Sequence, residues 1–88
     1  MNYVDSDRVN DYINNEIEYI KSDIENNKIH NNKNIIKDLQ QDLNYLNNLN
    51  DSDIEYITKK INNDEELQNK INELIHYWLY HKREGGNK

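Results

Sequence analysis

Apolar residues recur along the chain at intervals of three and four, which is the spacing of one face of an α-helix. In the first run, Ile13, Ile17, Ile20 and Ile24 fall within about 60° of one another around a helix axis. A broader run covers residues 34–49, a short one covers 54–61, and the last covers 67–79. This pattern predicts four helical segments and no strand.

Polar stretches separate these runs and supply the expected helix ends. The asparagine-rich stretch 25–34 predicts a turn, because asparagine tolerates the left-handed backbone conformation. Side chains able to cap free backbone N–H groups stand before three of the runs. These candidate caps are Asp5 or Ser6, then Ser52 with Glu55 completing a capping box, and then Asn63 or Asp64.

The expected fold class is all-α, as a small bundle of three long helices plus one short helix. We expect a single domain over residues 1–84 and a flexible tail over 85–88. Hydrophobic residues make up only 34% of the 88 residues, against about 45–50% in an average domain. The core is therefore expected to be thin, and dimerisation that completes it is an open alternative.

Seventeen acidic and eleven basic residues give a net charge of −6, which favours basic partners over direct contact with nucleic acid or anionic membrane. Cysteine is absent, and no apolar run approaches the roughly 18 residues of a membrane span. The first residues do not look like a signal peptide, so a cytoplasmic location is expected. The three histidines lack metal-ligand spacing, and no catalytic motif is present. We therefore expect neither a metal, a cofactor nor an enzymatic activity.

The acidic residues are concentrated in two blocks. Asp7, Asp11, Glu18 and Glu25 form one line on the side of the first helix opposite its isoleucines. The second block consists of Asp51, Asp53, Glu55, Asp64, Glu65 and Glu66. Such carboxylates form either a solvated helix face or an array that imitates a phosphate backbone and occupies a DNA-binding surface. The sequence leaves open whether the two blocks share a face.

Aromatic residues gather near the end of the chain. Trp78 falls at the centre of the apolar stripe of the last helix and is expected in the core. Tyr77 and Tyr80 fall outside that position, and exposed tyrosines often anchor protein interfaces. Both are candidate partner-binding residues, with an incidental surface as the alternative.

A very short, acidic, cysteine-free helical chain rich in Asn, Ile and Lys resembles the small host-takeover proteins of phages that infect A+T-rich Gram-positive bacteria. That resemblance implies binding to a host replication, transcription, repair or defence protein. Its most concrete form is a DNA mimic that inhibits the host DNA sliding clamp and so blocks DNA loading and replication. The alternatives are a homodimeric structural or assembly module, an anti-CRISPR protein, or a regulator that binds a phage repressor.

Overall fold

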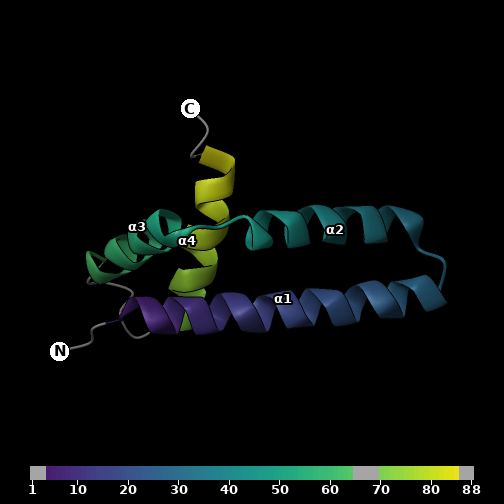
Figure 1. Cartoon of the computed structure of the whole chain (residues 1–88), viewed down its shortest axis with the longest axis horizontal. Coiled ribbons are helices and arrows are strands. Elements are labelled where there is room, and N and C mark those ends of the chain that lie inside the picture. Colours follow the sequence, from purple (N-terminus) through teal and green to yellow (C-terminus); the bar gives the residue numbers. More distant parts are fainter. Residues whose placement is uncertain (1–3, 65–69, 86–88) are drawn as a thin grey trace. The chain divides into compact units, whose positions relative to one another are not determined.

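The computed structural model describes residues 4–64 and 70–85, and its four elements are all α-helices. They are α1 (Ser6–Ile29), α2 (Lys33–Asn47), α3 (Asp51–Asn62) and α4 (Ile71–Gly85), as labelled in Figure 1. No strand occurs among the described residues. The all-α fold class predicted from the spacing of apolar residues is therefore confirmed.

Backbone contacts divide the chain into two compact units. Unit 1 comprises residues 1–12 and 50–88, and unit 2 comprises residues 13–49. Unit 1 therefore contains the first turns of α1 together with α3 and α4, whereas unit 2 contains the rest of α1 and α2.

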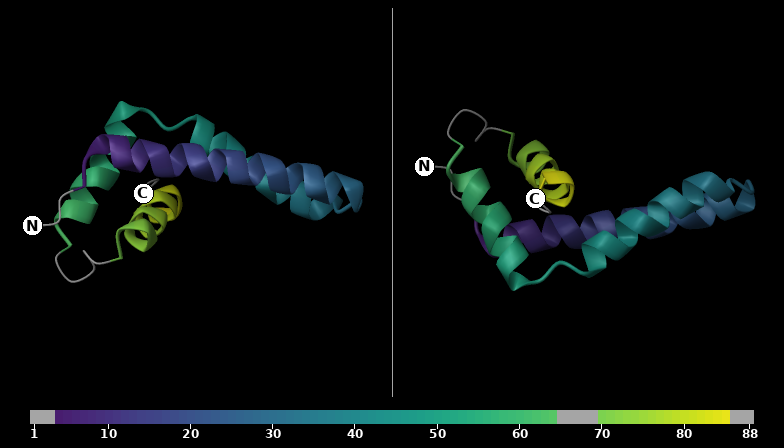
Figure 2. Two further views of the ribbon diagram at one scale, coloured as in Figure 1. Left: turned by 90° about the horizontal axis from the view of Figure 1, so that it is seen from below. Right: turned by 90° about the horizontal axis from the view of Figure 1, so that it is seen from above.

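The core of unit 1 is built from residues spaced four apart on successive helices. Ile57 and Ile61 lie on one face of α3, Ile75 and Leu79 lie on one face of α4, and Val9 comes from α1; all five are 0% exposed. Figures 1 and 2 show α3 and α4 side by side. Burial of these aliphatic side chains is the main stabilising contribution in this unit, at about 1.5–3 kcal/mol for each large one.

Polar contacts fix the start of the chain within unit 1. The Asn62 side chain donates to the Val4 carbonyl at 2.7 Å and accepts from the Val4 N–H at 2.9 Å. This pairing satisfies both backbone groups of Val4, much as a neighbouring strand would. Further along α1, Arg8 donates to Asn72 at 3.4 Å, and the Tyr12 hydroxyl lies 2.9 Å from Nδ1 of His76. Three contacts thus join residues near the N-terminus to α3 and α4.

Unit 2 is a helical hairpin in which α2 runs antiparallel to the second part of α1 (Figure 1). Ile20 and Ile24 of α1 and Leu46 of α2 are buried. Asn31 adopts φ 60° in the connection, a left-handed value that asparagine tolerates better than most residues. The predicted asparagine-rich turn is confirmed but is narrower than expected, because α1 continues to Ile29.

The helix caps correct two of the sequence predictions. Asp5 accepts from the Arg8 N–H at 3.0 Å, as expected for the first helix. For α3, however, the capping box is formed by Asn50 and Asp53 and not by Ser52 and Glu55. The pair two residues earlier has the same spacing and equally suitable side chains, so residue type alone could not distinguish them.

Of the two residues predicted to cap the last helix, Asn63 is instead the C-cap of α3, and the residues that follow Asp64, the other candidate, up to residue 69 lie outside the described part of the chain. The expected break after Ile61 is confirmed, and α4 begins at Ile71. Leu67, which was expected in the last helix, lies outside the described residues.

Candidate protein-binding surfaces

The predicted acidic line lies on α1, and all four of its carboxylate residues are exposed: Asp7, Asp11, Glu18 and Glu25. We call these four residues the acidic face. Lys21 lies 3.8 Å from Glu18 and Lys28 lies 3.2 Å from Glu25, each three residues further along the helix.

The charge of the acidic face is therefore uneven. Asp7 and Asp11 have no ion pair with a described basic residue, whereas Glu18 and Glu25 each have a lysine beside them. Exposed pairs of this kind contribute little free energy, about 0–1 kcal/mol, and break easily when a partner competes for the carboxylate. The two carboxylates of the acidic face without such a pair therefore both lie in the N-terminal turns of α1.

The second acidic block divides into residues with different roles. Asp51 and Glu55 are exposed on α3, whereas Asp53 is half-buried and its carboxylate accepts from the Asn50 N–H. Asp64 is half-buried just after α3. Glu65 and Glu66 lie outside the described residues. Asp53 is thus engaged in a helix cap, which makes it a weaker candidate for partner binding.

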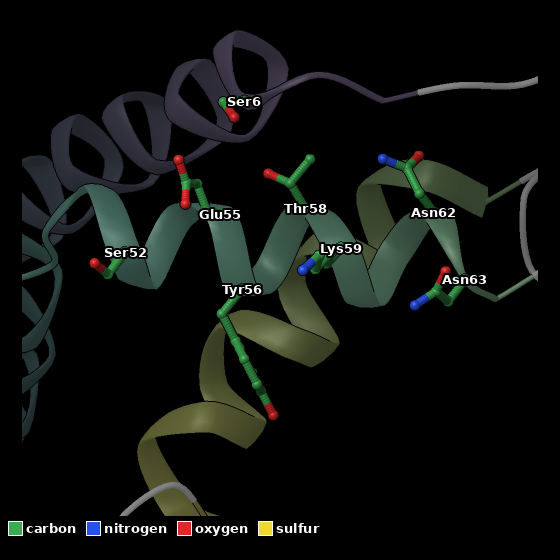
Figure 3. Close-up of a pocket in the computed structure, with 8 residues that line it drawn as sticks. All are labelled: Ser6, Ser52, Glu55, Tyr56, Thr58, Lys59, Asn62 and Asn63. Carbon is green, nitrogen blue, oxygen red and sulfur yellow. The ribbon is translucent and has the colours of Figure 1, made fainter.

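A groove of about 560 Å³ lies beside α3 in unit 1, and Figure 3 shows the residues that line it. Ser6 comes from the start of α1, while Glu55, Lys59 and five others come from α3 or its C-cap. Some of its polar side chains form hydrogen bonds within the protein. Thr58 donates to the Ile54 carbonyl at 2.7 Å, and Asn62 donates to the Val4 carbonyl at 2.7 Å. Among the described residues, the lining of the groove contains neither histidine nor cysteine and offers hydroxyl, amide, carboxylate and ammonium groups.

Glu55 of the second acidic block and Ser6 in the first turn of α1 line the same groove (Figure 3).

The aromatic residues of α4 form two clusters. Tyr77 is 54% exposed, and its ring stacks on His81 with centroids 5.2 Å apart. Tyr80 is half-buried on a different side, where its ring lies 4.8 Å from that of His76. The two tyrosines predicted as candidate partner-binding residues thus belong to separate clusters.

The Tyr77 cluster extends onto α3. Trp78 packs edge-on to both Tyr77 and His81, and the Lys60 ammonium lies 5.5 Å from the ring centroids of both Trp78 and Tyr56. We call Tyr56, Lys60, Tyr77, Trp78 and His81 the aromatic surface.

Sequence reasoning missed Tyr56, Lys60 and His81 as members of this surface. The spacing of four between Tyr56 and Lys60, and between Tyr77 and His81, is a signal that each pair shares a helix face. No sequence spacing joins the pair on α3 to the pair on α4, because that depends on how the helices pack.

Trp78 is only half-buried, although it was expected in the core. Its Nε1 atom is buried and has no hydrogen-bond partner among the described residues. The helical repeat predicted that Trp78 lies on the apolar side of α4, but it could not predict how much of the side chain the neighbouring residues cover. Leu74, Ile75 and Leu79 take the fully buried positions instead.

Within residues 4–64 and 70–85, no group of three potential metal-ligating side chains comes together. His76 and His81 belong to the two different aromatic clusters. No helix in this described part is long and apolar enough to cross a membrane. No protein-family model, curated protein or solved structure matches the chain.

Proposed function

We propose that the chain acts by binding another protein rather than by catalysis, and that its acidic face occupies a basic surface on a DNA-handling protein. The observation that carries the proposal is the exposure of Asp7, Asp11, Glu18 and Glu25 on a single helix. The four residues fall within about 40° of one another around an ideal helix axis, so they share one side of α1.

The carboxylates of the acidic face alone are sparser than the phosphates of a DNA strand, so the acids of the second block have to add to them if the chain is to imitate DNA. Asp7 and Asp11 are about 6 Å apart along a helix axis, and the next two intervals are about 10.5 Å each. A DNA-handling protein presents lysine and arginine side chains to the phosphate backbone, and a carboxylate array competes for them. The DNA sliding clamp of a Gram-positive host is the most concrete target of such a phage-type inhibitor.

The decisive experiment compares two variants that each remove four negative charges. The first carries Asp7→Asn, Asp11→Asn, Glu18→Gln and Glu25→Gln, which neutralises the acidic face. The matched control carries Glu16→Gln, Asp23→Asn, Asp38→Asn and Glu73→Gln, which changes the net charge equally at other positions. Binding to purified sliding clamp is measured at low and at physiological salt, with duplex DNA as a competitor.

We expect the wild type and the control to bind the clamp, to lose affinity as salt rises, and to compete with DNA. Neutralising the acidic face should weaken binding at least about tenfold. Equal binding by the two variants, or affinity that is independent of salt, would refute the acidic face as the binding surface. If the clamp does not bind, capture from a Gram-positive lysate with the same two variants identifies another target. A CRISPR protein would favour the anti-CRISPR alternative, and a phage repressor would favour the regulator alternative.

A second candidate function is a homodimeric assembly module, which is favoured by the incomplete burial of α2. Ile36, Leu39 and Leu43 are only half-buried, and Ile35 is 49% exposed. A second copy that covered this stripe would remove apolar area from water and stabilise unit 2. This alternative predicts a stable dimer, measured by sedimentation equilibrium, and a function that is kept when the acidic face is neutralised. A dimer of the wild type alone does not decide, because a DNA mimic can also dimerise.

A further inference from the structure

The aromatic surface has the composition of a binding hot spot in a protein–protein interface. Tyr56 and Tyr77 are 41% and 54% exposed, and Trp78 lies half-buried between Lys60 and Tyr77. Tryptophan and tyrosine are enriched among the residues that dominate binding free energy, since they supply a large contact area at a low cost in conformational entropy. The Tyr77 ring contacts both His81 and Trp78, which also contact each other, and rings that are already packed lose less conformational freedom when a partner binds.

Among the five residues of the aromatic surface, Lys60 carries a full charge, and that charge is positive although the whole chain is acidic. The Lys60 side chain is exposed, and its ammonium lies over two aromatic rings without an ion pair to any described carboxylate. Lys33, Lys37 and Lys59 also have no ion pair with a described carboxylate, so the two ring contacts are what set Lys60 apart. Lys60 therefore offers a fixed positive charge beside exposed aromatic area, and its natural complement is a carboxylate next to an apolar side chain.

We propose that the aromatic surface docks an acidic peptide segment of a partner protein. An apolar side chain of that segment packs on Tyr77 and Tyr56, and a neighbouring carboxylate pairs with the Lys60 ammonium. This site is separate from the acidic face and does not depend on the proposed function, because it selects a partner of the opposite charge.

Single-stranded nucleic acid also binds surfaces that combine aromatic rings with cations, but the geometry favours a peptide. Bases stack on free ring faces, whereas one face of Tyr77 is already covered by the parallel His81 ring at an interplanar angle of 10°. The net charge of −6 also repels a polyanion more than it repels a short segment with one or two carboxylates.

The test uses a library of short random peptides displayed on phage and selected on the immobilised full chain. The affinities of enriched peptides are then measured by fluorescence polarisation for Tyr77→Ala, Tyr56→Ala and Lys60→Gln. Matched controls are Tyr19→Ala, at a tyrosine that is 68% exposed on α1, and Lys37→Gln, at an exposed lysine of α2. Far-ultraviolet circular dichroism verifies that every variant keeps its helix content.

The expected result is enrichment of acidic peptides with an apolar residue beside the carboxylates. Tyr77→Ala should weaken their binding about tenfold or more, with smaller losses for Tyr56→Ala and Lys60→Gln, while the controls stay within about twofold. The absence of enrichment, the enrichment of basic peptides, or equal binding by the variants of the aromatic surface would each overturn the proposal. Binding of a single-stranded oligothymidine with the same dependence on Tyr77 and Lys60 would overturn it in favour of nucleic acid.

Discussion

The two units of this chain contain similar aliphatic residues but bury them to different extents. The largest fully buried side chains all belong to unit 1: Val4, Val9, Ile57, Ile61, Leu74, Ile75 and Leu79. Unit 2 buries four residues at 2–6% exposure, while Ile29 and Ile35 are 79% and 49% exposed. Among the described residues of unit 1, by contrast, the exposed large hydrophobic residues are two tyrosines, Tyr56 and Tyr77.

This difference follows from the number of helices that surround each apolar stripe. In unit 1, three helical segments face a common core, so a residue such as Ile57 has neighbours on several sides. In unit 2, two helices form a hairpin, and each stripe has only one partner helix within the unit. Amphipathic spacing is therefore enough to make a helix but not enough to bury its apolar face.

The largest expected effect of a substitution is in the core of unit 1. Ile57→Ala removes a fully buried side chain and leaves a cavity, which should lower the free energy of unfolding by about 3–4 kcal/mol. Ile35→Ala, at a residue that is 49% exposed in unit 2, should change it by less than about 1 kcal/mol. Urea unfolding followed by circular dichroism measures both. Equal losses would show that the two units do not differ in packing as described.

A smaller effect is expected where the start of the chain is held in unit 1. Asn62→Ala leaves the N–H and carbonyl of Val4 without their partner, which should cost about 2 kcal/mol. Asn26→Ala changes an exposed asparagine on α1 and should alter stability by less than about 0.5 kcal/mol. The same urea titration applies. A loss below about 0.5 kcal/mol for Asn62→Ala would indicate that water replaces the Asn62 contacts at little cost.

The smallest of the three effects concerns the cap of α3, at the point where the chain re-enters unit 1. Asn50→Ala removes a capping acceptor and should destabilise the protein by about 1 kcal/mol. Ser52→Ala lies inside the first turn and should have an effect within about 0.5 kcal/mol. Thermal unfolding monitored by calorimetry resolves the difference. If Ser52→Ala were the more damaging change, the cap assigned to Asn50 would be wrong.

The sequence by itself determined those features that depend on one helix at a time. Spacings of three and four specified four helical segments, and they placed Asp7, Asp11, Glu18 and Glu25 on one side of α1 and Ile54, Ile57 and Ile61 on the buried side of α3. These relations follow from the helical repeat, so no knowledge of neighbouring helices is needed. The N-cap of α3 could not be located from residue type, because asparagine and serine are both suitable N-cap residues and the sequence offers Asn50 and Ser52.

Only the tertiary structure decided what lies between helices. It brought Asn62 to Val4, 58 positions apart in the sequence, and it joined Tyr56 and Lys60 of α3 to Trp78 and Tyr77 of α4. It also left Trp78 half-buried where the helical wheel predicted the core. Such contacts depend on the crossing of helices and on the loops between them, and a periodic pattern within one helix carries no information about either.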